Sequence, residues 1–552
     1  MHYSKRRLWL FRLTAIIIPF VVFVLVELAF RIIPGLNEDR DPYVNISPVS
    51  VFSRKTIEGK EYYCITHRYV LGGQSVRILV KKPANAIRIF CVGSSACAGW
   101  PHPSSETFSA YLQQALETAY PKKKVEVVNA AGHGFAAYRT RLVLDEVLKM
   151  GPDAVIVWEG NNEFLEDRNY DPPGMMFVNL GRHLRTVQRI RSIIANRTKM
   201  SGDDLRNVAE FFWKKTRQKS LRLREDPTQF AQVKEHFRKS FEHMVRQSQR
   251  HETPIVLCTV PVNLRDWTPT VSVNHLKGEQ LVRWQELYNL SRRCLIEGRN
   301  QEGVNAMRRA IAMETNHGES YFWLGRLLEA DGQTEEAWEA FSKARDNDYN
   351  PFRAISSFNE TIRTLAKENQ NKGVFLLDLE RLFAKATKFA APGFDLLLDY
   401  VHPTKPANLM VAENLFTSLM SGGILKEKSD INHFIYRDLP TGPNGRDYRD
   451  ETDFHLQRTA IKMAMENRQY EAVVNKIENI PEQMTGKRQN APNDLVLKNF
   501  PPEFAEGYRV FRNYLDVERR AILGLSPSES EIENAKHQVD KFYEEWFPFG
   551  RF

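Results

Sequence analysis

Short apolar segments alternate with segments of helical periodicity, and this alternation limits the possible folds of the chain more than any other feature. Strands that are apolar on both faces and alternate with helices are typical of a parallel sheet covered by helices on both sides. We therefore predict an α/β fold of three layers, α/β/α, around a five-stranded parallel sheet. The predicted strands cover residues 87–93, 124–132, 153–160, 254–261 and 373–379.

Small and polar residues follow the ends of these predicted strands. Ser95 follows the first strand, the turn NAAGHG (129–134) follows the second, and GNNE (160–163) follows the third. The segment DYVHP (399–403) follows the fifth strand. Sites in open parallel sheets form beyond the carboxyl ends of the strands, so we expect these four blocks to meet. A serine nucleophile needs a base, a group that orients the base, and donors for the oxyanion.

The four blocks, in this order, resemble those of the SGNH hydrolase superfamily, also called GDSL-type esterases and lipases. The resemblance covers residues 87–165, 250–265 and 370–420. It implies a flavodoxin-like sheet and a serine hydrolase that acts on ester bonds without a cofactor or a metal.

The same resemblance implies a role for each matching residue. Ser95 would be the catalytic nucleophile, His402 the general base, and Asp399 the group that orients His402. The oxyanion hole would consist of the backbone N–H groups of Ser95 and Gly134 and the side-chain amide of Asn162.

The sequence departs from the family pattern at several positions. Ser94 stands where the family has an aspartate before the nucleophile, which puts substrate preference in doubt. Glu163 replaces the family's second aspartate. Gly132 competes with Gly134 for the oxyanion role, although the spacing from Asn129 favours Gly134. Cys97 offers a thiol as an alternative nucleophile, which no family pattern supports.

The amino terminus contains a long apolar run at residues 13–30. Four basic residues lie before it and an acidic group follows it near residue 40, so the charge bias predicts an amino terminus in the cytoplasm. We expect residues 1–35 to be an uncleaved, single-pass anchor in the cytoplasmic (inner) membrane, with the catalytic domain on the extracytoplasmic, periplasmic side. A cleaved signal peptide is the alternative.

The chain carries a formal net charge of +9, and its residues 182–224 are rich in Arg and Lys. A solvated helical face within an insertion at 165–250 explains this stretch, and a surface for anionic lipid or an acidic polymer is the alternative. A chain outside the cell is not expected to bind nucleic acid. The five cysteines are odd in number and form no CxxC pair, which argues against a disulfide framework or a zinc site.

A second insertion, at residues 280–350, contains a repeat. Gly303, Met307 and Ala310 recur 34 positions later as Ala337, Phe341 and Ala344. This pattern resembles the tetratricopeptide repeat, a helix–turn–helix unit that could bind a protein partner. Residues 458–480 are predicted to be a further helical pair within a helical carboxyl-terminal region.

These patterns divide the chain into segments with different expected roles. They are an anchor at 1–35, a linker with short strands at 36–86, two parts of the SGNH domain at 87–279 and 351–425, the repeat insertion at 280–350, and the helical region at 426–552.

We expect a membrane-anchored esterase that hydrolyses O-acyl esters, with O-acetyl groups on a glycan or lipid favoured. An O-acyltransferase of envelope polysaccharides could use the same triad. A tetratricopeptide scaffold with a relict site is the non-enzymatic alternative.

Overall fold

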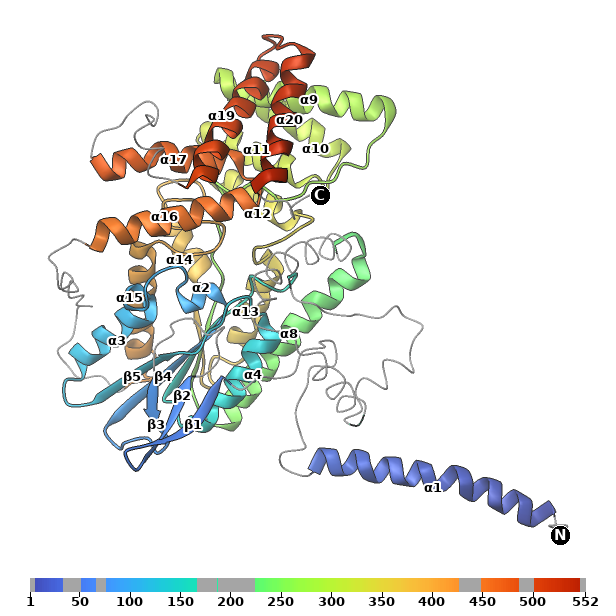
Figure 1. Cartoon of the computed structure of the whole chain (residues 1–552), viewed down its shortest axis with the longest axis vertical. Helices are drawn as coiled ribbons and strands as arrows, with labels where there is room; N and C mark the ends of the chain where they lie inside the picture. The colour runs from blue at the N-terminus through green and yellow to red at the C-terminus, as the bar shows by residue number, and fades with distance from the viewer. Residues whose placement is uncertain are drawn as a thin grey trace. The chain divides into compact units, whose positions relative to one another are not determined.

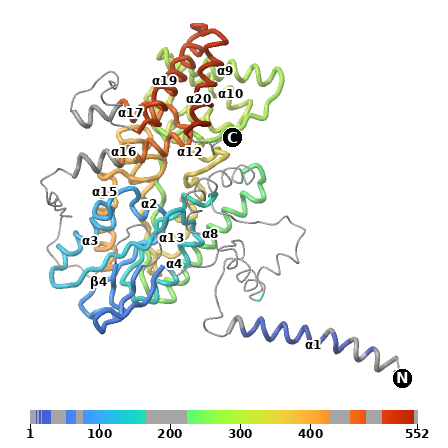
Figure 2. The backbone as a smooth tube through the Cα atoms, in the orientation of Figure 1, coloured from blue at the N-terminus to red at the C-terminus, as the bar shows by residue number. Residues whose placement is uncertain are grey.

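The computed structural model of the chain describes residues 5–32, 51–65, 76–165, 186, 224–425, 448–485 and 501–546 (Figures 1 and 2). The chain divides into two compact units, one formed by residues 1–49 and 167–209 and the other by residues 50–166 and 210–552. The first unit contains helix α1 (Lys5–Ile32), on which apolar side chains such as Phe20 and Leu25 are exposed. Within the described ranges, no helix has both the length and the apolar character that a bilayer span requires.

The second unit is built around a five-stranded sheet in which every neighbouring pair of strands is parallel. Its strand order is β5-β4-β6-β7-β8. All side chains of the central strands β4 and β6 are buried, because helices cover both faces of the sheet. The predicted fold class is therefore confirmed. The strands are β4 (Ala86–Gly93), β5 (Lys124–Asn129), β6 (Ala154–Trp158), β7 (Ile255–Cys258) and β8 (Val374–Leu377).

Helices form one layer on each face of this sheet (Figure 1). Helices α3 and α15 contact each other and the edge strands β5 and β8. Helices α4, α8 and α13 pack together on the opposite face. Shorter elements include α2 (Ser95–Ala98), the 3-10 turns Ser104–Glu106 and Leu148–Met150, and α14 (Leu379–Ala386). The layer helices are α3 (Phe108–Ala119), α15 (Lys405–Ser421), α4 (Ala137–Val147), α8 (Pro227–Arg250) and α13 (Ser356–Glu368).

A small antiparallel sheet precedes the α/β core in the chain. It consists of β1 (Phe52–Ile57), β2 (Lys60–Ile65) and β3 (Arg77–Leu79). The carboxylate of Glu146 on α4 accepts hydrogen bonds from the backbone N–H groups of Val51 at 2.9 Å and Phe52 at 3.1 Å, which attaches the sheet to the core. Residues 36–50 and 66–75 of the predicted linker segment, 36–86, lie outside the described residues.

The repeat insertion forms consecutive helices that pack against one another: α9 (Gly278–Glu297), α10 (Asn300–Met313), α11 (Gly318–Ala330) and α12 (Thr334–Asp346). A Cβ atom on Gly325 would come within 2.7 Å of the Phe341 ring. The small residue therefore allows the close approach of two helices that the repeat pattern predicts. The tetratricopeptide assignment stays a prediction.

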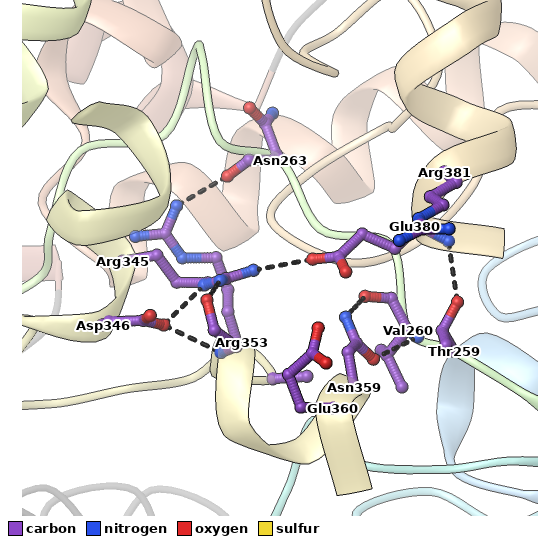
Figure 3. A network of polar contacts seen from close by, with 12 residues as sticks. Thr259, Val260, Asn263, Arg345, Asp346, Arg353, Asn359, Glu360, Glu380 and Arg381 are labelled. Carbon is purple, nitrogen blue, oxygen red and sulfur yellow. Dashed lines mark hydrogen bonds and ion pairs between the residues drawn. The ribbon is translucent and has the colours of Figure 1, made fainter. Parts of the chain in front are cut away.

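A buried polar network attaches this insertion to the α/β core (Figure 3). Arg345 at the end of α12 is 1% exposed and pairs with Asp346 at 2.9 Å and with Glu380 of α14 at 3.2 Å. Arg353 donates to the carbonyl groups of Asn263 at 2.6 Å and Trp267 at 2.8 Å. These bonds join segments that are far apart in the sequence.

The carboxyl-terminal region is helical, as predicted. It contains α16 (Tyr448–Glu466), α17 (Tyr470–Thr485), α19 (Pro502–Ile522) and α20 (Glu529–Trp546). Helices α16 and α17 form the further helical pair expected near residues 458–480. The basic stretch at 182–224 lies almost entirely outside the described residues.

Candidate active site

The turn between β4 and α2 holds Ser95 at the carboxyl end of the central strand. Gly93 lies against β6, and a Cβ atom there would come within 2.0 Å of the Trp158 carbonyl oxygen and 2.8 Å of the Cys97 Cβ. Only glycine therefore fits at this position. The backbone N–H of Ser94 donates to the same Trp158 oxygen at 3.4 Å. This close packing fixes the path of the chain into Ser95.

Ser95, His402 and Asp399 form one continuous relay of hydrogen bonds. The Nε2 atom of His402 lies 2.9 Å from the Ser95 Oγ, and its Nδ1 atom lies 2.7 Å from the Asp399 Oδ2. The side chains of His402 and Asp399 are 3% and 1% exposed. This arrangement allows the imidazole to take a proton from the serine while the carboxylate holds the ring in the required tautomer.

The Asp399 carboxylate is held in its charged form. Its Oδ1 accepts hydrogen bonds from the backbone N–H groups of Val401 and His402, both at 2.9 Å. Burial alone would raise the pKa of Asp399, but the charge of His402 and these N–H donors outweigh it and keep the pKa below its usual value. A buried anion therefore faces the imidazole on the side away from Ser95.

Two of the predicted oxyanion donors, Gly134 and Asn162, lie in loops that are bonded to each other. The Asn162 Nδ2 donates to the Phe135 carbonyl at 2.8 Å, one residue after Gly134. Gly134 is exposed and has a φ of 66°, whereas Gly132 already donates its N–H to the Gly93 carbonyl at 3.0 Å. That bond occupies the Gly132 donor, so the geometry favours Gly134 over Gly132.

Two aromatic residues that the sequence analysis did not select contribute to this site. The Trp100 ring contacts two imidazoles, with its centroid 4.6 Å from that of His402 and 5.7 Å from that of His133. Burial, and then the charge of His402, lower the pKa of His133 to about 4. His133 is therefore neutral at neutral pH. The position of His133 next to Gly134 was the only signal in the sequence that this histidine lies at the site.

A pocket of about 290 Å³ adjoins Trp100. His102, Thr107, Ser109 and Asn129 contribute polar side chains to its wall. The His102 Nε2 bonds to the Pro403 carbonyl at 2.7 Å, and its buried Nδ1 has no partner among the described residues. The pocket therefore combines an aromatic ring with groups that can form hydrogen bonds.

The alternative nucleophile Cys97 does not fit the geometry. Its side chain is completely buried, and burial raises the pKa of its thiol well above the usual value. A buried neutral thiol is a poor nucleophile. Among the described residues, no group of three or more His, Cys, Asp or Glu side chains is placed to hold a metal ion.

Comparisons with known proteins add a structural likeness. No family model and no curated protein match the chain. A solved structure described as an acetyl xylan esterase, AlAXEase, is 14% identical, with a TM-score of 0.27. The match covers 60% of this chain and 100% of that chain.

Proposed function

We propose that this protein is a serine esterase of the SGNH type, in which Ser95 attacks the carbonyl of an O-acyl ester. His402 takes the serine proton as the bond forms and then donates it to the leaving alcohol. The resulting acyl-serine is hydrolysed by a water molecule that His402 activates. The N–H groups of Ser95 and Gly134 and the amide of Asn162 are assigned to the oxyanion.

The observation that carries this proposal is the relay from Ser95 Oγ through His402 to the buried Asp399, with distances of 2.9 and 2.7 Å. Ser95 and His402 are far apart in the sequence and meet because both follow strands of one parallel sheet. A structural role for this contact would not need a buried carboxylate held by two further backbone donors.

A polar alcohol, such as a hydroxyl of a glycan, is the leaving group that we propose. The pocket beside Trp100, which neither Ser95 nor His402 lines, offers an aromatic ring and polar side chains of the kind that suit a sugar. Acetyl is the proposed acyl group. Attachment to the cytoplasmic membrane with an extracytoplasmic site is also part of the proposal and rests on the sequence of residues 1–41 alone. Alkaline extraction of membranes and amino-terminal and carboxyl-terminal reporter fusions test that part.

Hydrolysis of para-nitrophenyl acetate by the full chain tests the catalytic role. The Ser95→Ala variant should lose about 10³-fold or more of kcat/KM, because no nucleophile remains. Ser94→Ala is the matched control, since the neighbouring hydroxyl is buried and makes no cap bond. We expect this control to stay within a few-fold of the wild type.

Equal rates in the wild type and a folded Ser95→Ala variant would remove Ser95 as the nucleophile for this ester. A wild type that labels at Ser95 with a fluorophosphonate but does not release acetate would indicate a strict transferase, which acyl transfer to an added sugar would then show. A folded wild type that shows neither labelling at Ser95 nor turnover of the ester would favour the scaffold alternative.

A further inference from the structure

His102 joins the segment that carries the proposed nucleophile to the catalytic loop, residues 399–404. Its Nε2 lies 2.7 Å from the carbonyl oxygen of Pro403, the residue directly after His402. A carbonyl oxygen can only accept a hydrogen bond, so Nε2 carries the ring proton and is the donor. The side chain is 9% exposed, which excludes most of the water that could compete for that oxygen. His102 therefore holds the main chain of the catalytic loop one residue away from the proposed base.

The other nitrogen of the His102 ring shows that a single donor is enough for this contact. The Nδ1 atom is buried and has no hydrogen-bond partner among the described residues. Burial lowers the pKa of His102, although the Pro403 carbonyl and Glu106 act in the opposite direction. A charged ring would have to bury a second N–H without an acceptor. The side chain is thus neutral near pH 7, and a neutral amide that reaches the carbonyl can make the same bond.

Backbone hydrogen bonds tie His102 to Ser95. The N–H of Trp100 donates to the Ser95 carbonyl at 3.1 Å, and the N–H of His102 donates to the Gly99 carbonyl at 2.9 Å. The Trp100 ring also lies edge-on to the imidazole of His402, at an interplanar angle of 65°. The segment after Ser95 therefore contacts both the ring of the proposed base and the backbone that follows it.

The catalytic loop would pass a displacement of Pro403 on to His402. The N–H of Leu398 donates to the His402 carbonyl at 2.7 Å, directly before Pro403. Directly after Pro403, the N–H of Thr404 donates to the Leu396 carbonyl at 2.9 Å. With a backbone bond on each side of Pro403, the loop has little freedom to absorb a movement at that residue alone.

We propose that His102 is a positioning residue of the active site, which holds the backbone after His402 so that the imidazole stays within reach of the Ser95 hydroxyl. The proposal rests on the proposed function for its catalytic consequence. The Nε2 of His402 lies 2.9 Å from the Ser95 Oγ, and a displacement of about 1 Å would lengthen this contact beyond hydrogen-bond range. Asp399 sets the tautomer and orientation of the ring, whereas His102 sets its distance from the nucleophile.

The test replaces His102 by leucine and by glutamine in the full chain. Leucine fills the buried position without a donor, whereas the glutamine amide can still donate to the Pro403 carbonyl. In hydrolysis of para-nitrophenyl acetate, His102→Leu should lose about 10²-fold of kcat with little change in KM, because the base is displaced while ester binding is not. His102→Gln should recover most of this loss. His251→Leu, at an exposed position, is the control for the substitution itself and should keep the wild-type rate.

Amide hydrogen exchange provides a second readout, which does not depend on activity. In His102→Leu, the amides of Leu398 and Thr404 should exchange about tenfold faster than in the wild type, while those of β4 should be unchanged. In His102→Gln, all of these amides should exchange as in the wild type. Faster exchange of the loop in a chain that hydrolyses no ester would support the role of His102 in holding the loop, so failure of the proposed function is distinguishable.

Three results would overturn the proposal. The first is wild-type exchange of the loop in a folded His102→Leu variant. The second is an active enzyme in which His102→Leu keeps its kcat, or in which His102→Gln loses as much kcat as His102→Leu, because the hydrogen bond would then not matter for the reaction. The third is failure of both His102 variants to fold, because the histidine would then support the whole fold rather than the position of the base.

Discussion

Both carboxylate oxygens of Asp399 help to hold the segment that contains His402. One oxygen accepts from two backbone N–H groups and the other from the imidazole Nδ1. In Asp399→Asn, the amide oxygen can still accept the backbone bonds, so its NH₂ group would face Nδ1. The ring would then carry its proton on Nε2, where it cannot take the proton of Ser95.

We therefore expect Asp399→Asn to fold and to lose about 10³- to 10⁴-fold of kcat with little change in KM. Steady-state hydrolysis of para-nitrophenyl acetate measures this loss, with Asp395→Asn on the same loop as the control. A loss below about tenfold in a correctly folded variant would contradict the assigned role.

His133 is expected to make the stability of the folded protein depend on pH, because its pKa is lower in the folded protein than in the unfolded chain. Its pKa is 6.5 as a free side chain and about 4 in the folded protein, because of burial and the charge of His402. Between these values the unfolded chain binds a proton that the folded chain does not bind. The contribution of His133 to stability is therefore complete above pH 6.5 and is lost as the pH falls toward 4.

Urea unfolding at pH 7.5 and pH 4.5 checks this expectation. His133→Gln should lose less stability between the two pH values than the wild type, whereas His251→Gln, at an exposed position, should follow the wild type. Identical pH dependence in the wild type and His133→Gln would show that the imidazole is not excluded from protonation.

At the scale of elements, the turn from β4 into α2 is held by a glycine that no other residue can replace. Gly93→Ala would place a methyl group against a backbone oxygen of β6, which cannot move without displacing a central strand. We expect a loss of about 2–3 kcal/mol in the free energy of unfolding and a loss of esterase activity.

Gly59→Ala is the matched control for this substitution. Gly59 also has a positive φ, of 76°, but a Cβ atom there would meet nothing within 4 Å. Both substitutions carry backbone strain, at a φ of 157° for Gly93 and 76° for Gly59, but only Gly93→Ala also has the clash, so thermal unfolding should show a clearly larger loss for Gly93→Ala. Similar melting temperatures for the two variants would contradict the argument.

The elements and the relay were predictable from the sequence, but the surroundings of the relay were not. Continuous apolar runs predicted every strand of the parallel sheet, and residues at the ends of such strands converge by topology. The contact of Trp100 with His133 depends on the paths of two loops, which leave no periodic pattern in the sequence. The predicted strand at 124–132 ends at Asn129 because residues 130–132 turn while still bonding to β4.

At the scale of the whole second unit, a buried ion pair connects the repeat insertion to the site. Arg353 and Asp348 are 2% and 1% exposed and lie 3.8 Å apart. Next to Arg353, the backbone N–H of Ala354 donates to the Asn161 side-chain oxygen at 3.0 Å, directly before Asn162. The segment after α12 therefore supports both the insertion and the loop of a proposed oxyanion donor.

Because these bonds cross between the insertion and the core, we expect the two to unfold together in the wild type. Arg353→Met would leave Asp348 buried without its cation, at a cost of about 3–5 kcal/mol. Amide hydrogen exchange of this variant should then show α11 and α12 losing protection before β4 and β6. In the wild type, the amides of all four elements should exchange with the same free energy of opening. Arg308→Met, which removes an exposed ion pair within the repeat, should keep the wild-type pattern. If the insertion and the α/β core exchange separately in the wild type, the insertion is an independent domain. The network in Figure 3 would then be a local contact rather than a structural link to the α/β core.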